Sequence, residues 1–169
     1  MLGIRWFDCT VTGMEAHAGP TPMALRKDAL LAATRIMQDV VAAAHRHPPH
    51  GRGTVGMVQV FPNSRNVIPG RIKFSIDLRN STDTLVDAMA AEVKAFADQV
   101  AKEHGVQVHI EMVSSYPAQL FQPECVQAVG RAAAKLGYSH MPAVSGAGHD
   151  AVYMAKLAPS GMIFIPCKD

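Results

Sequence analysis

The sequence predicts an α+β fold in which strands and helices follow the order β-α-β-β-α-β, a ferredoxin-like arrangement, ahead of an incomplete α/β segment. Three observations lead to this prediction. Residues 72–79 alternate apolar and polar side chains with the period of a half-buried strand. The segments 29–44 and 85–100 repeat apolar residues at the three-to-four spacing of amphipathic helices. Residues 162–167 form a continuous apolar run, which is typical of a strand buried on both faces of a parallel sheet.

The first strand is predicted over residues 4–12, and a turn-rich loop leads from it into the first helix. Thr21 is the expected N-cap of that helix and Pro22 its first residue, because hydroxyl side chains cap helices and proline fits the first turn. The helix is expected to reach about His45 and to end before Pro48. Its predicted apolar stripe consists of Ala29, Ala33, Ile36, Met37, Val40, Val41 and Ala44.

Two further strands are predicted over residues 53–61 and 72–79, followed by the second helix. Ser81 or Asp83 is the expected N-cap, and Gly105 should end the helix as its C′ residue. The predicted core stripe of this helix consists of Leu85, Met89, Val93, Phe96 and Val100. A fourth strand is expected over residues 106–113, with Val106, Val108, Ile110 and Met112 facing inward.

The pattern changes after Tyr116, where alternating strands give way to helix and glycine-rich loop. A helix is predicted from Pro123 to Leu136, ended by Gly137, and a short helix from Ala151 to about Leu157. The apolar strand at 162–167 has no partner strand nearby in this part of the sequence. We therefore expect two domains, residues 1–115 and an incomplete second domain over residues 116–169.

The composition is that of a globular protein with few charges. Of 169 residues, 49% are hydrophobic and 18% are charged, and the formal net charge is +2. Lysine and arginine are scattered rather than gathered in a basic run, so we expect no nucleic-acid partner. No apolar run reaches the length of a membrane span, and neither a membrane segment nor a secretory leader is expected. Cys9, Cys125 and Cys167 are far apart and odd in number, which favours reduced thiols and a cytoplasmic location.

The loop 62–70 and the strand after it combine polar groups in an unusual way. Two prolines and a closing glycine stiffen the loop, Asn66 lies within it, and Arg79 closes the strand. This stretch is either an ordinary hairpin connection or a support that presents amide and guanidinium groups. Asp77 and Arg79 share the polar face of the strand, so a surface ion pair is the ordinary explanation for these two residues.

The histidines differ in how much their surroundings suggest. His45, His47 and His50 surround a helix end and could bind a metal, but a solvated helix terminus is the simpler explanation. His17 and His149 lie in loops whose small neighbours leave an imidazole uncrowded, although each loop alone is weak evidence. The sequence contains neither a G-x-S-x-G nor an H-E-x-x-H motif.

Four motifs occur together in a fixed order along the chain. They are His17-Ala-Gly-Pro-Thr-Pro-Met with Arg26-Lys-Asp-Ala-Leu, Pro62-Asn-x-x-Asn-Val-Ile-Pro-Gly with Asp77-Leu-Arg79, Ser145-Gly-Ala-Gly-His-Asp-Ala, and Met162-Ile-Phe-Ile-Pro-Cys. This set resembles the hydantoinase/carbamoylase family of amidases in the M20 metallopeptidase-like clan. Members of that family include N-carbamoyl-L-amino acid hydrolase, allantoate amidohydrolase and β-ureidopropionase. The resemblance covers essentially all 169 residues.

The resemblance implies a two-domain subunit that dimerises. Residues 1–115 would be the lid or dimerisation domain, through which a homodimer forms, and residues 116–169 a returning part of the catalytic domain. The family's catalytic domain holds two divalent metal ions, and zinc, manganese and cobalt are the candidates for the full-length parent. The family's metal ligands and catalytic glutamate lie outside the motifs matched here. We therefore expect this chain to be a fragment that binds no metal and is inactive alone.

The resemblance also assigns roles to four residues. His17 corresponds to the family's lid histidine, which stabilises the oxyanion of the tetrahedral intermediate, generally across the dimer. Asn66 and Arg79 correspond to substrate-binding residues, with Arg79 clamping the substrate carboxylate and Asn66 bonding the same carboxylate or its neighbourhood. His149 corresponds to a substrate-side group near the metals.

The function expected from the resemblance is hydrolysis of a linear amide or ureido C–N bond. The substrate would be a small N-carbamoyl amino acid or a related ureido acid, such as allantoate or β-ureidopropionate. The alternative is a non-catalytic ferredoxin-like module that serves for dimerisation or for binding a small ligand.

Overall fold

The computed structural model describes residues 1–167 and contains two compact units. The larger unit is Gly3–Pro117, and the smaller unit combines Met1–Leu2 with the chain from Ala118 onward. Within residues 1–167, no helix is both long enough and apolar enough to cross a membrane.

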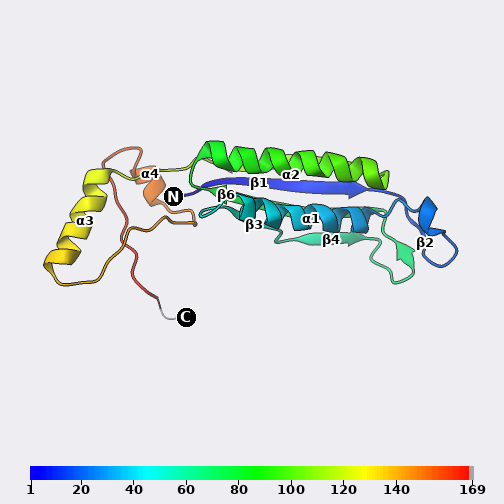
Figure 1. Cartoon of the computed structure of the whole chain (residues 1–169), viewed down its shortest axis with the longest axis horizontal. Helices are drawn as coiled ribbons and strands as arrows, with labels where there is room; N and C mark the ends of the chain where they lie inside the picture. The colour runs from blue at the N-terminus through cyan, green and yellow to red at the C-terminus, as the bar shows by residue number, and fades with distance from the viewer. Residues whose placement is uncertain (168–169) are drawn as a thin grey trace. The chain divides into compact units, whose positions relative to one another are not determined.

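The larger unit is built on an antiparallel sheet with the strand order β3-β6-β1-β7, in which β4 also pairs with β6 (Figure 1). Its strands are β1 (Gly3–Thr12), β3 (Arg52–Thr54), β4 (Val58–Phe61), β6 (Arg71–Asn80) and β7 (Gln107–Tyr116). The central strands β1 and β6 pair along their whole lengths, from Gly3 opposite Asn80 to Thr12 opposite Arg71. Ile72, Phe74, Ile76 and Leu78 are buried, which confirms the alternation predicted for this strand.

The strand predicted over 53–61 is divided into β3 and β4. At the division, the hydroxyl of Ser75 on the neighbouring strand β6 accepts hydrogen bonds from the backbone N–H groups of Gly56 and Met57, at 3.3 and 3.0 Å. The carbonyl of Met57 still accepts from the N–H of Ser75 at 3.1 Å, so the chain stays bonded to β6 here, and the regular pairing resumes at Val58.

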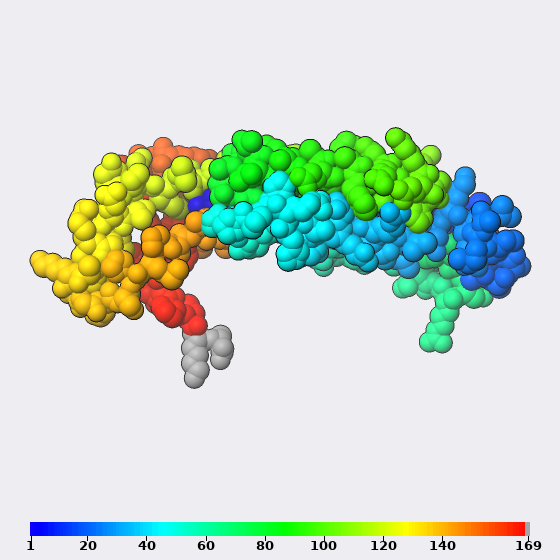
Figure 2. All heavy atoms as spheres, viewed as in Figure 1, coloured from blue at the N-terminus to red at the C-terminus, as the bar shows by residue number. Residues whose placement is uncertain are grey.

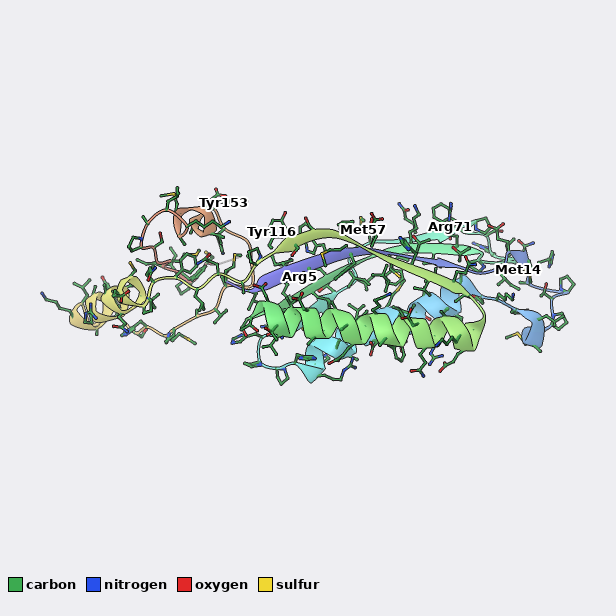
Figure 3. The ribbon with its side chains drawn as sticks, turned by 90° about the horizontal axis from the view of Figure 1, so that it is seen from above. Arg5, Met14, Met57, Arg71, Tyr116 and Tyr153 are labelled. Carbon is green, nitrogen blue, oxygen red and sulfur yellow. The ribbon has the colours of Figure 1, made fainter. Side chains whose placement is uncertain are left out.

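Helices α1 (Ala29–Arg46) and α2 (Asp83–His104) lie on the same face of the sheet, as Figure 3 shows from above. They enclose one hydrophobic core with the inward side chains of β1 and β6. Most residues of the two predicted apolar stripes are buried, but Val41 on α1 and Leu85 on α2 are exposed. Four residues outside the predicted stripes are also buried, namely Ala32 and Ala43 on α1 and Val86 and Ala97 on α2.

The predicted N-caps of both helices were wrong. Asp28, not Thr21, caps α1, and its carboxylate accepts from the N–H groups of Leu30 and Leu31 at 2.9 and 3.0 Å. The Thr21 hydroxyl donates to the carbonyl of His17 instead, and the segment Met23–Leu25 forms a separate 3-10 turn, η1. Thr82, not Ser81 or Asp83, caps α2.

The structure confirms the predicted end of α2 but contradicts the predicted burial of one residue of β7. Gly105 ends the helix in the left-handed conformation, with φ 62°, as predicted. Met112 was predicted to face inward, but it is 52% exposed. Its register places it opposite Phe7, on the same face as Ile110 opposite Cys9, so the predicted alternation holds up to this residue. It is exposed although β7 keeps this register, and β7 is the last strand in the sheet order, with a neighbouring strand on one side only.

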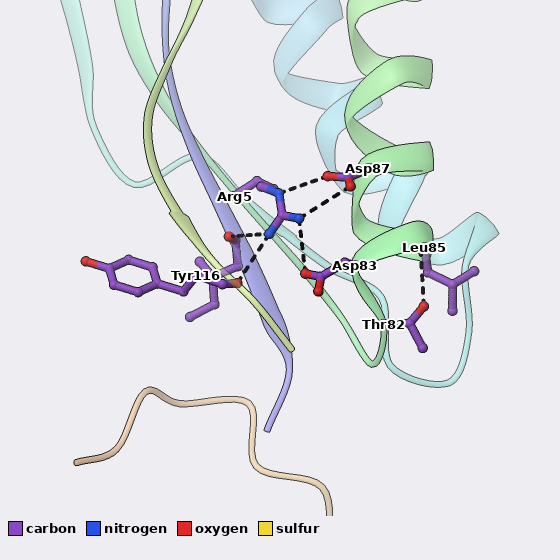
Figure 4. A network of polar contacts seen from close by, with 7 residues as sticks. Arg5, Thr82, Asp83, Leu85, Asp87 and Tyr116 are labelled. Carbon is purple, nitrogen blue, oxygen red and sulfur yellow. Dashed lines mark hydrogen bonds and ion pairs between the residues drawn. The ribbon is translucent and has the colours of Figure 1, made fainter. Parts of the chain in front are cut away.

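Arg5 joins three elements at one end of the larger unit (Figure 4). This side chain is only 7% exposed, and its guanidinium donates to Asp87 and Asp83 on α2 at 2.8 and 3.1 Å. It also donates to the carbonyls of Ile4 and Tyr116, at 3.1 and 3.2 Å. A buried guanidinium is tolerated here because carboxylates and carbonyls satisfy its donors.

The smaller unit contains α3 (Pro123–Lys135) and α4 (Ala151–Met154). Gly137 follows α3 with φ 74°, as the prediction of a glycine stop required. The strand predicted over 162–167 is not formed, and Ile163 and Ile165 are 69% and 75% exposed. Within the described part of this unit there is no other strand to pair with, so the apolar run cannot form the buried parallel strand that its pattern predicts.

Candidate functional site

Two loops that are far apart in the sequence meet in the larger unit and carry His17 and Asn66. The short strands β2 (Ala16–His17) and β5 (Val67–Ile68) pair antiparallel, with His17 opposite Val67. The N–H of Ala18 also donates to the carbonyl of Asn66 at 2.8 Å. In the space-filling view, the segments containing His17 (blue) and Asn66 (blue-green) gather at the same end of this unit (Figure 2). The structure therefore brings two of the predicted site residues together.

The base of these loops is packed too closely for ordinary side chains. The N–H of Gly13 donates to the carbonyl of Gly70 at 2.8 Å. A Cβ atom on Gly70 would lie 2.4 Å from Cγ of Glu15, and one on Gly13 would lie 2.0 Å from the carbonyl oxygen of Lys27. The closing glycine of the 62–70 loop is thus required by this close approach.

The imidazole of His17 has one nitrogen engaged and is otherwise exposed. Its Nδ1 accepts a hydrogen bond from the backbone N–H of Gly19, at 3.0 Å. A backbone N–H can only donate, so Nδ1 must be unprotonated while this bond exists. In the neutral ring the proton is then on Nε2, which makes that atom a hydrogen-bond donor.

The loop after His17 is held by Arg26 and Thr21. Arg26 donates to the carbonyl of Ala18 at 2.6 Å and twice to the carbonyl of Thr21, at 3.1 and 3.0 Å. The Thr21 hydroxyl donates to the carbonyl of His17 at 2.7 Å. The sequence analysis missed this role of Arg26 because it placed residues 22–45 in one helix. The Arg26-Lys-Asp motif was the available signal, since its aspartate is the true cap of α1.

Asn66 is oriented by a neighbour in its own loop. The hydroxyl of Ser64 donates to Oδ1 of Asn66 at 3.0 Å. Because the carboxamide oxygen is used in this way, the NH₂ group of Asn66 is the part suited to bind an acceptor such as a carboxylate. Asn63 in the same loop has a left-handed backbone, with φ 60°, which asparagine tolerates better than most residues.

Arg79 lies at the other end of the sheet from His17 and Asn66. It is opposite Ile4 on β1, whereas Arg71, at the start of the same strand, is opposite Thr12 next to the two loops. Eight residues of extended strand separate the two ends by roughly 26 Å. In Figure 3, Arg5 and Tyr116 mark one end, and Met14 and Arg71 the other. Within one chain, Asn66 and Arg79 therefore cannot bind the same small carboxylate.

The guanidinium of Arg79 has a carboxylate partner in its own strand. Its Nε donates to both oxygens of Asp77, at 3.0 and 3.2 Å. This hydrogen bond raises the pKa of Arg79 above its ordinary value. The ion pair offered as the ordinary explanation is thus present, and it holds the planar group in one orientation on the polar face of the sheet.

His149 belongs to the smaller unit. Its Nε2 lies 2.7 Å from Oγ of Ser145, and its ring makes an edge contact with Phe164 at 5.7 Å between centroids. The N–H of Ala147 donates to the same Ser145 hydroxyl at 3.2 Å. The glycine-rich loop is therefore arranged around Ser145, which the sequence analysis did not assign a role.

The described residues do not fit a two-metal centre. In residues 1–167, no group of three or more His, Cys, Asp or Glu side chains could hold a metal ion. Of the three histidines at the end of α1, His47 bonds Glu92 through Nε2 at 2.7 Å. This contact favours the explanation as a polar helix terminus.

A hollow of about 310 Å³ lies on the side of the sheet away from the two helices. Its lining includes Asp8 and Thr10 from β1, Lys73 from β6 and Glu111 from β7. None of the four predicted site residues lines this hollow. We assign it no role.

Comparisons with known proteins agree on one group of relatives. The family described as the peptidase dimerisation domain matches residues 2–105. An N-carbamoyl-L-amino-acid amidohydrolase of Rhizobium meliloti is 45% identical over 98% of this chain and 40% of its own length. An allantoate amidohydrolase of Bacillus subtilis is 31% identical over 99% of this chain and 41% of its own length.

The solved structures point the same way. A hydantoinase/carbamoylase family amidase from Burkholderia ambifaria superposes with a TM-score of 0.95 and 43% identity, covering 98% of this chain and 41% of that one. The chain thus spans about two fifths of the length of the relatives that it matches. These similarities confirm the resemblance inferred from the four sequence motifs.

Proposed function

Because this chain belongs to the M20 peptidase dimerisation domain family, we propose that it is part of an amidohydrolase. The enzyme would cleave the linear amide or ureido C–N bond of N-carbamoyl amino acids or related ureido acids such as allantoate. The names of the relatives support the reaction class. Residues 1–115 would be the lid and dimerisation domain, and residues 116–169 a part of the catalytic domain. The strand order β3-β6-β1-β7, with both helices on one face, supports a ferredoxin-like description of the lid.

The observation that carries this proposal is the state of His17. Hydrolysis of an amide or ureido group passes through a tetrahedral intermediate whose oxygen becomes negatively charged. A fixed hydrogen-bond donor near that oxygen lowers the barrier. The contact between Gly19 and Nδ1 leaves the neutral ring with Nε2–H as such a donor, on an exposed side chain that a substrate can reach.

We place the substrate contacts in a site shared between two copies of the chain. His17 and Asn66 lie at one end of the larger unit and Arg79 at the other, so one small molecule cannot touch all three within one copy. A homodimer that forms through this domain could bring the loop of one copy to Arg79 of the other. Arg79 would then bind the substrate carboxylate, for which its planar fork is suited.

The family's metal chemistry would depend on residues outside those described. Two divalent ions, such as zinc, manganese or cobalt, would lower the pKa of the attacking water when bound. We assign no step to a metal here, because residues 1–167 provide no such centre. We propose that this chain alone is inactive and that the enzyme acts in the cytoplasm.

The first experiment compares this chain with the protein encoded by the complete open reading frame that contains it. We expect the complete protein to hydrolyse N-carbamoyl amino acids and this chain not to do so.

His17→Ala in the complete protein should lower kcat by about 10² to 10³, as loss of an oxyanion donor does. Arg79→Gln should mainly raise KM, whereas Arg52→Gln, a change at its cross-strand neighbour on β3, should leave KM unchanged. An unaltered KM in Arg79→Gln would contradict the carboxylate clamp, and turnover by this chain after metal removal would contradict the reaction scheme.

A mixed dimer tests whether the site is shared between copies. His17→Ala and Arg79→Gln subunits are combined in equal amounts and assayed at a substrate concentration at which each variant alone is nearly inactive. If the site is shared, half of the mixed dimer's sites regain both residues. Random assortment then predicts about a quarter of the wild-type activity. If His17 and Arg79 act within one copy, mixing restores nothing. If the domain is instead a non-catalytic module, mixing the variants also restores no activity. That case is recognised because the complete wild-type protein is then inactive as well.

A further inference from the structure

We propose that Arg26 is a positioning residue that holds His17 in the tautomer required for hydrogen-bond donation from Nε2. This inference rests on the proposed function, because it explains how the same histidine is prepared for its role. Arg26 itself need not touch the substrate. It acts through the backbone of the loop that follows His17.

The tautomer of His17 depends on the position of one backbone group. A neutral imidazole can carry its proton on either nitrogen, and the hydrogen bond at one nitrogen decides which form is favoured. Here the deciding group is the N–H of Gly19, 3.0 Å from Nδ1. If the loop moved so that this bond were lost, the ring would be free to place its proton on Nδ1.

The backbone of Gly19 lies close to the ring of His17. A Cβ atom at this residue would lie 3.2 Å from Cε1 and 3.3 Å from Nδ1 of the His17 ring. The backbone of Gly19 thus lies directly against the imidazole, and the absence of a side chain permits this contact.

The loop around Gly19 has few backbone donors of its own. Pro20 and Pro22 have no N–H group to donate, so the carbonyls around them need other donors. Arg26 supplies these donors. It binds the carbonyl of Ala18 on one side of Gly19 and that of Thr21 on the other, at 2.6 and 3.0 Å from the same Nη2 atom.

The use of Arg26 is unusual for a charged side chain. It is half-buried, and within residues 1–167 it forms no ion pair, so its donors serve neutral carbonyls of the His17 loop. The planar guanidinium can bridge two carbonyls at once, whereas a lysine ammonium would bind as a single point. This bridge between two carbonyls distinguishes Arg26 from an arginine that only contacts solvent at the surface.

The test observes His17 directly, by ¹⁵N NMR of the chain with ¹⁵N-labelled histidine at alkaline pH. We expect an unprotonated Nδ1 and a protonated Nε2 in the wild type. In Arg26→Gln the ratio of the two tautomers should shift toward the Nδ1–H form by about fivefold, the factor expected for one ordinary hydrogen bond. Arg26→Lys should give an intermediate shift.

Arg52→Gln is the matched control. Arg52 also donates to backbone carbonyls, those of Pro49 and Gly51 at 3.1 and 2.8 Å, but on β3 at the other end of the sheet. The tautomer ratio should not change in this variant. Equal ratios in Arg26→Gln and Arg52→Gln, or a wild-type His17 protonated on Nδ1, would overturn the proposal.

A second variant provides an independent check if Arg26→Gln is poorly folded. Thr21→Val removes only the hydroxyl that bonds the carbonyl of His17, at 2.7 Å, and should shift the ratio in the same direction. An unchanged ratio in a folded Thr21→Val protein would also count against the proposal. These spectra do not require activity, so they remain informative if the protein proves to have another function.

Discussion

At the scale of single residues, the role of a side chain depends on contacts that sequence spacing does not reveal. Thr21 has the chemistry of a helix cap, yet its hydroxyl bonds a carbonyl within the His17 loop. Arg26 was expected inside a helix, yet it bridges two loop carbonyls. In both cases the nearest hydrogen-bond partner in space, rather than the residue type, determines the role.

Cys9 and Cys167 should differ strongly in reactivity. Cys9 is fully buried in the core, and burial raises the pKa of its thiol to about 12. Since the thiolate is the reactive form, Cys9 should not react with a disulfide reagent at neutral pH. Cys167 is exposed and should react within the mixing time.

Counting reactive thiols with and without denaturant measures this difference. We expect Cys9 to react only when the larger unit unfolds, so its rate should follow the fraction unfolded. A Cys9→Ala variant identifies the slow phase. A slow phase that persists in this variant would show that Cys9 had been assigned incorrectly.

At the scale of elements, the helices were predicted correctly as elements but not at their first residues. The first helix was expected to begin seven residues too early, because Pro22 and a preceding threonine imitate a helix start. Residues 23–25 do form a helical turn, but Arg26 is extended and interrupts it. The carboxylate of Asp28 then begins α1 by binding two N–H groups.

Asp28→Ala should therefore destabilise the larger unit by about 1 kcal/mol, the usual cost of a lost N-cap. Urea unfolding followed by circular dichroism measures this change. Ser81→Ala is the control, because Ser81 was a predicted cap that the structure does not use, and its effect should stay within about 0.5 kcal/mol. Equal losses in the two variants would argue against the cap assignment.

At the scale of the whole molecule, ion pairs join the end of α1 to the middle of α2. Arg46 bonds Asp39 at 3.0 Å and Glu92 at 2.9 Å, and His47 bonds the other oxygen of Glu92. The hydrogen bond with His47 lowers the pKa of Glu92 below its ordinary value of 4.5, and Arg46 lowers it further. Folding therefore favours the ionised form of this carboxylate.

The pH dependence follows from the sign of this shift. The folded state binds the Glu92 proton more weakly than the unfolded state does, so the stabilisation is complete above pH 4.5 and is lost as the pH falls through the lowered pKa. Glu92→Gln should thus reduce the loss of stability between about pH 6 and about pH 3.5. Glu111→Gln is the control, since Glu111 forms no ion pair among residues 1–167. Parallel stability curves for wild type and Glu92→Gln would refute this assignment.

Much of the larger unit could be predicted because its information is local. The alternation of Ile72, Phe74, Ile76 and Leu78 specifies one buried strand face, and Gly105 specifies a helix end. The prediction for Met112 was wrong because alternation gives the face of a residue but not the place of its strand, and β7 is the last strand of the sheet. The strand predicted over 162–167 is not formed for a related reason. A strand needs partner strands, and the apolar pattern cannot show whether they are present.

The sequence by itself determined the order of the main strands and helices of the larger unit, the buried face of β6, and the four motifs that led to the family. Periodicity and motif order are properties of the chain alone, so they survive without coordinates. Only the tertiary structure decided that His17 and Asn66 meet while Arg79 lies at the opposite end of the sheet. That separation depends on antiparallel register, which places residues near in sequence far apart along a strand and joins distant loops through backbone hydrogen bonds.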